Sequence, residues 1–241
     1  MRHQGEQPRK GCSFSPRADG DTGGRMFRHV RELRIARRKR RSEMSSRLAQ
    51  FRALFKAAGE ETLFAELCFC IMTANANALL CDAAHKELCA KGLFLKGRAA
   101  EIAPYLRGKA RFHNKKAGYI VRARNFFLRS GRLDVRGRLA GGDAIVAREW
   151  LVDHVKGLGY KEASHFLRNI GLGRNIAILD RHILKNLIRH GVIRVIPSSV
   201  ASRAAYVGIE NKMRAFSDHI GIPMDELDLL FWSFQTGFIF K

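Results

Sequence analysis

From Ser45 onward, the apolar residues of this chain recur at steps of three and four positions, which is the period of an amphipathic helix. In this part of the chain, no stretch alternates apolar and polar residues over the length of a strand, and no Asn-Gly or Asp-Gly pair marks a tight hairpin turn. The first two helical faces carry Leu48, Phe51 and Phe55, then Leu63, Leu67 and Ile71. The pattern predicts an all-α fold without internal repeats.

Capping and stop signals place several of these helices. Asn75 or Asn77 is a candidate N-cap for a helix that ends before Gly92, and Asp143 is a candidate N-cap for a later one. Three further helices are expected: one that carries Tyr119 to Phe127 and stops at Gly131, one over about 198–219, and one over 224–235.

The segment 144–171 predicts two helices joined by the turn Gly157-Leu158-Gly159. The second helix presents one apolar face and ends at Gly171. Glycines in the turn permit close backbone approach, and the unpaired N–H groups at the start of the second helix favour an anion. We therefore predict a helix-hairpin-helix in which Gly157 and Gly159 bind a phosphate of the DNA backbone. The plainer alternative is a tight helix connection, which also uses glycine.

Charge narrows the class of partner. The 241 residues contain 44 Lys and Arg against 22 Asp and Glu, a formal net charge of +22. This excess indicates a polyanionic partner, most often nucleic acid and less often an anionic membrane surface. Residues 1–44 hold 13 basic and 5 acidic residues, which leaves 31 basic against 17 acidic in the other 197. The folded part is therefore basic in its own right.

Residues 1–44 are rich in glycine, proline and arginine and contain the basic run 34–41. We expect this stretch to be a basic, disordered N-terminal extension, and residues 45–241 to form the folded domain. Two alternatives are open: a nuclear-import or non-specific nucleic-acid arm, and sequence upstream of a start at Met26 or Met44.

The five cysteines do not indicate a metal site or a secreted protein. They stand at positions 12, 68, 70, 81 and 89, an odd number, and four of them fall in one apolar, helical region. The C-x-C at Cys68 and Cys70 fits no common zinc spacing without a second close pair. We expect these cysteines to be buried small hydrophobic residues.

The sequence shows no membrane span and no signal peptide. Its longest apolar run, Leu67–Met72, is far shorter than the roughly 18 apolar residues that a span needs. The N-terminus is polar and lacks the apolar region of a signal peptide. We expect a soluble intracellular protein without membrane contact, cytoplasmic in a prokaryote or nuclear in a eukaryote.

Lys161 stands at the start of the second hairpin helix, and Asp180 follows nineteen residues later, at the start of a helix over 181–190. A lysine amine can attack C1′ of a nucleotide and form a Schiff base. A carboxylate can stabilise the positive charge that develops on the sugar as an N-glycosidic bond breaks. The pair predicts Lys161 and Asp180 as catalytic residues. The plainer alternatives are a solvated surface lysine and an N-cap.

The run from Val155 to Ile183 resembles the helix-hairpin-helix/Gly-Pro-Asp superfamily of DNA base-excision glycosylases. The resemblance puts Lys161 at the catalytic lysine of the bifunctional members and Asp180 at the essential aspartate. The Gly-Pro that precedes the aspartate in many members is absent, and Arg174–Ala177 stand there instead, which excludes a close match to the commonest human-type 8-oxoguanine enzyme. The cysteine cluster of the iron–sulfur endonuclease III branch is also missing.

Three further runs are similar to the compact archaeal-type 8-oxoguanine DNA glycosylase/lyases: Leu67–Asn75, Arg111–Ala117, and Asp225–Trp232 with the last residue, Lys241. The similarity covers about residues 45–241. It implies two helical subdomains with a cleft between them, and an enzyme that needs no metal or organic cofactor. A monovalent cation at the hairpin is left open.

The same resemblance suggests residues of a base pocket. Trp232 matches a pocket aromatic and would stack on an extruded base, with a core position as the equal alternative. Phe112 is a weaker candidate, for which core packing is favoured. Lys241 offers an ammonium and, as the last residue, a free carboxylate. Burial of residues 238–240 would hold it against the core, whereas a frayed end is the alternative.

We therefore predict a DNA glycosylase that removes 8-oxoguanine from double-stranded DNA as a monomer and cleaves the abasic site by β-elimination through a lysine Schiff base. Two alternatives are open. One is a glycosylase of the same fold with another lesion preference, such as an oxidised pyrimidine or a mismatched thymine. The other is a non-catalytic helix-hairpin-helix module, against which the spacing of Lys161 and Asp180 argues.

Overall fold

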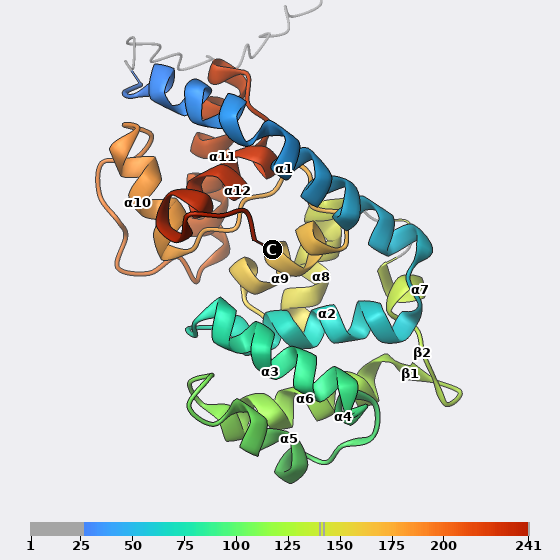
Figure 1. Ribbon diagram of the computed structural model, residues 1–241. Coiled ribbons are helices and arrows are strands. Elements are labelled where there is room, and N and C mark those ends of the chain that lie inside the picture. Colours follow the sequence, from blue (N-terminus) through green and yellow to red (C-terminus); the bar gives the residue numbers. More distant parts are fainter. Residues whose placement is uncertain (1–26, 140, 142, 241) are drawn as a thin grey trace, which may run out of the picture.

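The computed structural model describes residues 27–139, 141 and 143–240. These residues form twelve helices and one short two-stranded sheet, which confirms the predicted all-α class (Figure 1). The first six helices are α1 Val30–Ala57, α2 Glu60–Thr73, α3 Ala78–Ala90, α4 Leu93–Lys96, α5 Ala99–Leu106 and α6 His113–Phe127. After strands β1 Leu128–Arg129 and β2 Arg132–Leu133 come α7 Val135–Leu139, α8 Ala144–His154, α9 Tyr160–Asn169, α10 Arg181–Arg189, α11 Arg203–Ile220 and α12 Met224–Thr236.

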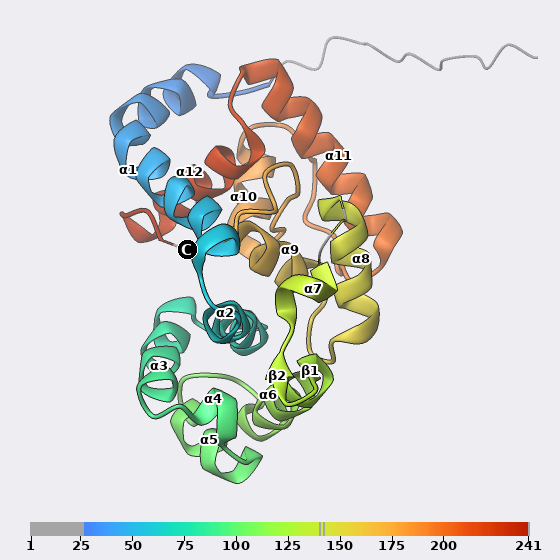
Figure 2. The ribbon, with the colours of Figure 1, turned by 90° about the vertical axis from the view of Figure 1, so that its right-hand side faces the viewer.

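Two hydrophobic cores divide the molecule. The first core is built by residues 63–176, from α2 to α9. The second combines α1 with residues 177–231, so the N-terminal helix packs with the C-terminal part of the chain. Figures 1 and 2 show α1, α10, α11 and α12 above, and α2 to α6 below, with α8 and α9 between them. The predicted two helical subdomains are confirmed.

Local capping signals place helices α3 and α8 where the sequence predicted them. Of the two candidate caps for α3, the structure uses Asn77, whose Oδ1 accepts from the backbone N–H groups of Leu79 (2.9 Å) and Leu80 (3.2 Å). Asp143 caps α8 by accepting from Ile145 N at 2.8 Å. Each cap satisfies N–H groups that the first turn of a helix leaves without a partner.

Two helix bounds differ from the prediction. Helix α6 ends at Phe127 instead of Gly131, because residues 128–133 turn back as the hairpin β1–β2. Its two turn residues, Ser130 (φ +48°) and Gly131 (φ +77°), have the positive φ values that a tight two-residue hairpin requires. The helix expected from about 198 begins at Arg203, where Ser202 caps it by accepting from Ala205 N.

The predicted disordered extension over residues 1–44 is wrong for residues 30–44, which belong to helix α1. Residues 30–44, expected to be disordered, form the first half of α1, and Leu33 and Met44 are each only 1% exposed. In the same stretch, Arg37 pairs with Glu226 of α12 (Nε–Oε2 2.6 Å). The domain boundary at residue 44 is therefore wrong, because helices from the far end of the chain bury the apolar face of this basic segment.

Two truncated proteins, one lacking residues 1–44 and one lacking residues 1–26, test whether residues 27–44 contribute to stability. Deleting residues 1–44 should lower the free energy of unfolding by several kcal/mol, because a buried Leu or Met side chain is worth roughly 2–5 kcal/mol. Deleting residues 1–26 leaves α1 whole and should shift the melting temperature by less than about 2 °C. Thermal unfolding followed by circular dichroism measures both. Equal melting temperatures for the two truncated proteins would contradict the role of α1 in the core.

The cysteine prediction holds for three residues. Cys68, Cys70 and Cys81 are fully buried, whereas Cys89 is exposed on α3, so the prediction is wrong for Cys89; Cys12 lies outside the described residues. Within the part of the chain that the structure describes, no group of three or more His, Cys, Asp or Glu is placed to hold a metal ion. None of the described helices is long and apolar enough to cross a membrane.

Candidate active site

The predicted helix-hairpin-helix is present. Helix α8 ends at His154, α9 begins at Tyr160, and residues 155–159 connect them. Four apolar side chains of the second helix are fully buried, as predicted: Ala163, Phe166, Leu167 and Ile170. Gly171 follows with φ +82°, and a Cβ there would lie 2.5 Å from Cα of Arg52 in α1. Glycine at this position therefore lets α1 cross the end of the hairpin helix closely.

Gly157 is the residue that lets the turn rest on α6. Its φ is +97°, and a Cβ there would lie 2.6 Å from Cδ2 of Tyr119. Gly159 has extended backbone and precedes the first residue of α9, where its N–H donates to Glu162 Oε2 at 3.2 Å. Position 157 therefore requires glycine for two reasons: its positive φ and its close approach to Tyr119.

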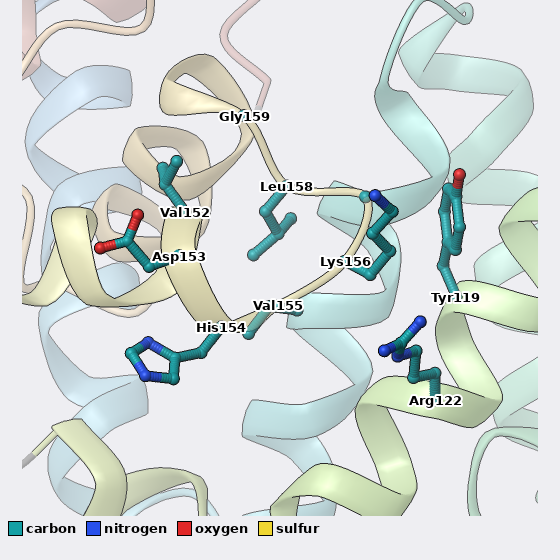
Figure 3. Close-up of a pocket in the computed structure, with 10 residues that line it drawn as sticks. Tyr119, Arg122, Val152, Asp153, His154, Val155, Lys156, Leu158 and Gly159 are labelled. Atoms are coloured by element: carbon teal, nitrogen blue, oxygen red, sulfur yellow. The ribbon is translucent and has the colours of Figure 1, made fainter.

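A surface hollow of about 530 Å³ lies against this turn. Residues 152–159 line one side, and Tyr119 and Arg122 of α6 line the other (Figure 3). The lining contains two basic residues, Arg122 and Lys156, and one acidic residue, Asp153, so its charge is positive on balance. This arrangement suits an anion such as a DNA phosphate, which is the role that the sequence predicts for Gly157 and Gly159.

Replacing Gly157 by alanine should weaken DNA binding. Alanine there meets an unfavourable φ and the ring of Tyr119, so the turn must shift away from α6. We expect the dissociation constant for duplex DNA to rise about tenfold, as when one charge-assisted phosphate contact is lost. Fluorescence anisotropy with a labelled duplex measures this change. Gly118→Ala, in the middle of α6 with open space around its Cα, is the matched control. Equal affinities for the two variants would exclude a phosphate-binding turn.

Lys161 is not a solvated surface lysine. Its side chain, in the first turn of α9, is 23% exposed, and its Nζ lies 3.2 Å from Oε1 of Glu162. A second lysine, Lys116 of α6, is almost fully buried, and its Nζ donates to Met72 O (2.6 Å) and Ala74 O (2.5 Å) at the end of α2. Burial lowers the pKa of Lys116, and the charge of Lys161 lowers it further. Lys116 and Lys161 therefore lie close enough for the charge of one to affect the pKa of the other.

Asp180 caps α10, as the plainer interpretation predicts. Its Oδ1 accepts from Ile183 N at 2.8 Å. The carboxylate is half-buried at the end of a segment without regular structure that connects α9 to α10. A cap leaves the second carboxylate oxygen available for another role, so the two predicted functions of Asp180 are compatible.

A third carboxylate, Asp228 of α12, is buried within electrostatic range of both Lys161 and Asp180. Its carboxylate Oδ2 lies 3.4 Å from Nη2 of Arg168, and both side chains are buried. Burial above all, with the charges of Asp180 and Asp225, raises the pKa of Asp228 to about 7, although the charges of Arg168 and Lys161 lower it. Lys161 and Asp180 therefore both lie within electrostatic range of one buried carboxyl.

Trp232 lies one helical turn after Asp228 on α12 and is partly exposed. Its ring stacks on Phe240 (centroids 5.3 Å apart, 22° between planes) and meets the edge of Phe238 at 6.2 Å. Phe240 packs against the first core and Ile239 against the second, whereas Phe238 is 42% exposed. The segment 238–240 is therefore only partly buried. Lys241 itself lies outside the described residues.

Phe112 does not pack in the core, so that interpretation is wrong. It precedes the first residue of α6 with left-handed backbone (φ +56°), and its side chain is 57% exposed. The guanidinium of Arg111 and the ammonium of Lys115 lie over its ring, 5.1 and 5.9 Å from the centroid. An exposed aromatic ring between two cations fits a surface that meets nucleic acid.

The sequence missed Lys116, Arg168 and Asp228. Their partners stand 42 or more residues away along the chain, so no local spacing marks them. The one signal was the position of Asp228, four residues before Trp232 in an otherwise apolar helix face.

Comparison with known proteins agrees with this geometry. The family model described as 8-oxoguanine DNA glycosylase matches residues 44–222. An 8-oxoguanine DNA glycosylase/AP lyase of Fusobacterium nucleatum is 39% identical over 201 residues, which are 83% of this chain and 92% of that protein. One of Methanocaldococcus jannaschii is 40% identical over 199 residues, 82% of this chain and 91% of its own.

Solved structures show the same fold. The 8-oxoguanine DNA glycosylase of Thermotoga maritima superposes with a TM-score of 0.78 at 36% identity, over 88% of this chain and 98% of its own. The Methanocaldococcus jannaschii 8-oxoguanine glycosylase/lyase, in complex with a 15mer DNA that contains 8-oxoguanine, superposes with a TM-score of 0.79 at 36% identity. The match covers 88% of this chain and 99% of that chain. The family model, the relatives and the shared fold together show that the chain belongs to the 8-oxoguanine DNA glycosylase family.

Proposed function

We propose that this protein removes 8-oxoguanine from duplex DNA and then cleaves the strand at the abasic site. Its family membership supports the substrate class, since its relatives are 8-oxoguanine DNA glycosylase/AP lyases. The observation that carries the mechanism is the placement of Lys161: it stands in the first turn of α9, directly after the turn of the hairpin, and its charge and that of Asp180 both act on one buried carboxyl.

In this mechanism, Lys161 is the nucleophile. The neutral amine forms a bond from Nζ to C1′ while the bond from C1′ to N9 of the base breaks, and the base leaves with the electron pair and takes up a proton. The deoxyribose ring then opens to a Schiff base. Loss of a proton from C2′ expels the 3′ phosphate by β-elimination, and water releases the lysine. Asp180 stabilises the positive charge that develops on the sugar as the base departs.

The DNA approaches through the hairpin and the cations around it. The turn at Gly157 holds one phosphate, and the damaged base leaves the stack to enter the cleft between the subdomains. Trp232 stacks on the extruded base, and Phe112 fits the DNA surface. The protein acts as a monomer inside the cell, where its substrate is. Neither a metal nor an organic cofactor enters any of these steps.

Borohydride trapping on a duplex with 8-oxoguanine opposite cytosine tests the proposal. A covalent protein–DNA adduct should form with the lesion duplex and not with the matched guanine duplex. Duplexes with an oxidised pyrimidine or a mismatched thymine test the other lesion preferences. If an adduct forms only with one of these duplexes, that lesion and not 8-oxoguanine is the substrate. If no adduct forms with any duplex, the protein is a non-catalytic DNA-binding module.

Lys241 is proposed to discriminate 8-oxoguanine from guanine. The two bases differ at C8 and at N7, so discrimination depends on a few polar contacts, and a buried group left unpaired can reject an analogue strongly. The stacking of Phe240, the preceding residue, on Trp232 supports a position beside the base pocket.

Replacing Lys241 by alanine should lower the rate of 8-oxoguanine excision by about tenfold or more, since a lost charged hydrogen bond is worth roughly 1.5–3 kcal/mol. Lyase activity on a preformed abasic site should change little, because no base is left to recognise. Single-turnover gel assays on the two substrates give both rates. Lys212→Ala removes the same charge from the exposed face of α11 and is the control. Equal loss of both activities in the Lys241 variant would refute the role in base recognition.

A further inference from the structure

The segment that leads into Asp180 is buried without being part of a helix or a strand. Ala177, Ile178 and Leu179 are 0%, 5% and 3% exposed, and the stretch 174–180 contains no proline that would restrict its backbone. Buried backbone N–H and C=O groups must find partners, since each one left unpaired costs about as much as a lost hydrogen bond. What holds this segment also sets the position of the Asp180 carboxylate.

Three side chains of α11 supply these partners. Arg214 Nη2 donates to Asn175 O at 3.0 Å. Glu210 Oε1 accepts from Ala177 N at 2.7 Å. The hydroxyl of Tyr206 donates to Ala177 O at 2.7 Å and accepts from Leu179 N at 3.2 Å. Tyr206 therefore holds the last backbone groups before Asp180.

The spacing of these contacts is regular. Tyr206, Glu210 and Arg214 stand four residues apart, which is about 6 Å along an α-helix. Their targets follow one another along the segment in the opposite direction: Arg214 binds Asn175, Glu210 binds Ala177, and Tyr206 binds both Ala177 and Leu179. One face of α11 therefore holds the segment at successive points up to the residue before Asp180.

The same group of side chains reaches the helix that carries Lys161. Arg148 of α8 donates to Glu210 through two hydrogen bonds (2.7 and 3.0 Å), and both side chains are at most 1% exposed. The Oγ of Ser164, three residues after Lys161 on α9, lies 3.4 Å from both the Tyr206 hydroxyl and Arg148 Nη1. The Tyr206 hydroxyl thus lies between α9 and the segment that ends at Asp180. Burial raises the pKa of Tyr206, so the hydroxyl keeps its proton.

We propose that Tyr206 is a positioning residue, which fixes the carboxylate of Asp180 relative to Lys161 by binding the backbone of Ala177 and Leu179. It does not touch the DNA or the reacting atoms. The inference rests on the proposed function, because it gives Asp180 a catalytic role, and it adds a residue on α11 on which that role depends.

A double-mutant cycle tests the inference. Tyr206→Phe keeps the ring and removes the hydroxyl. Its single-turnover rate constant for 8-oxoguanine excision should fall about tenfold or more, while the dissociation constant for the lesion duplex stays within about twofold. When Asp180 is already asparagine, adding Tyr206→Phe should lower the rate by less than twofold, because the hydroxyl acts through the carboxylate.

Ser217→Ala is the matched control for lost stability. Ser217 is also on α11 and 4% exposed, and its hydroxyl donates to the backbone oxygen of Ile222 at 2.5 Å. This variant should lose stability as Tyr206→Phe does and keep the wild-type excision rate. If Tyr206→Phe does not fold, Arg214→Gln takes its place: it is more exposed, should slow excision about threefold, and should have no effect when Asp180 is asparagine.

The outcomes separate the inference from the proposed function. If Asp180→Asn is slow and Tyr206→Phe excises at the wild-type rate, or if the two losses multiply, the inference is overturned and the proposed function stands. If Asp180→Asn is itself fully active, both the catalytic role of Asp180 and the inference fail. A slow Tyr206→Phe whose defect disappears in the Asp180→Asn protein, beside a fast Ser217→Ala, supports the inference.

Discussion

Replacing Lys161 by glutamine should abolish both base release and strand nicking. Glutamine has nearly the length of lysine but no amine that can bond to C1′, so neither the displacement of the base nor the Schiff base can occur. The side chain is three-quarters buried, and its Nζ contacts Glu162, which limits its freedom of movement. We expect excision to fall by at least about 10³-fold and the borohydride adduct to vanish.

DNA binding should survive this substitution. The proposed phosphate contacts lie at the turn around Gly157 and the neighbouring cations, and Lys161 is not among the residues that line the hollow there. The dissociation constant for the lesion duplex, measured by anisotropy, should stay within about threefold of the wild-type value. Lys212→Gln, on the exposed face of α11, controls for the lost charge. A full-yield adduct with the Lys161 variant would move the nucleophile to another amine, and Lys116 would be the first to test.

Local signals predicted the hairpin and the helix starts because those features depend on neighbouring residues. Asn77 and Asp143 cap the helices that follow them, and Gly171 ends the second hairpin helix. The first half of α1, residues 30–44, was missed because its apolar residues are separated by arginines, and helices from the C-terminal part of the chain bury them. Composition indicates a tail in such a segment, whereas tertiary packing decides the structure.

In the candidate site, too, the sequence predicted the residues that stand at helix starts but not those that depend on tertiary contacts. Lys161 and Asp180 were predicted from their positions at two helix starts and from the resemblance, and the charges of both act on the pKa of a buried carboxyl on α12. The groups that surround them are charged residues paired over long sequence distances, such as Arg148 with Glu210, 62 residues apart. A sequence pattern does not mark such pairs, because burial of a charge is set by the elements that cover it.

Asp180→Asn should separate the two functions of this residue. Asparagine caps helices about as well as aspartate, so its Oδ1 can accept from Ile183 N as before, and the melting temperature should change by less than about 3 °C. The negative charge, however, is lost. A neutral amide stabilises the developing positive charge on the sugar far less than a carboxylate does, and we expect single-turnover excision of 8-oxoguanine to fall by roughly 10²-fold or more.

Comparing excision with the reaction on a preformed abasic site shows how much the charge of Asp180 contributes to base release. No glycosidic bond to a base remains there, so Schiff-base formation by Lys161 should lose much less than excision does, and the ratio of the two rates should change by about tenfold or more. The substitution also removes one of the charges that raise the pKa of Asp228, so that pKa should fall below 7, which carboxyl titration by NMR measures. A variant that unfolds would show that the cap requires the carboxylate. One that excises 8-oxoguanine at the wild-type rate would leave Asp180 as a helix cap and place the stabilising charge on another residue.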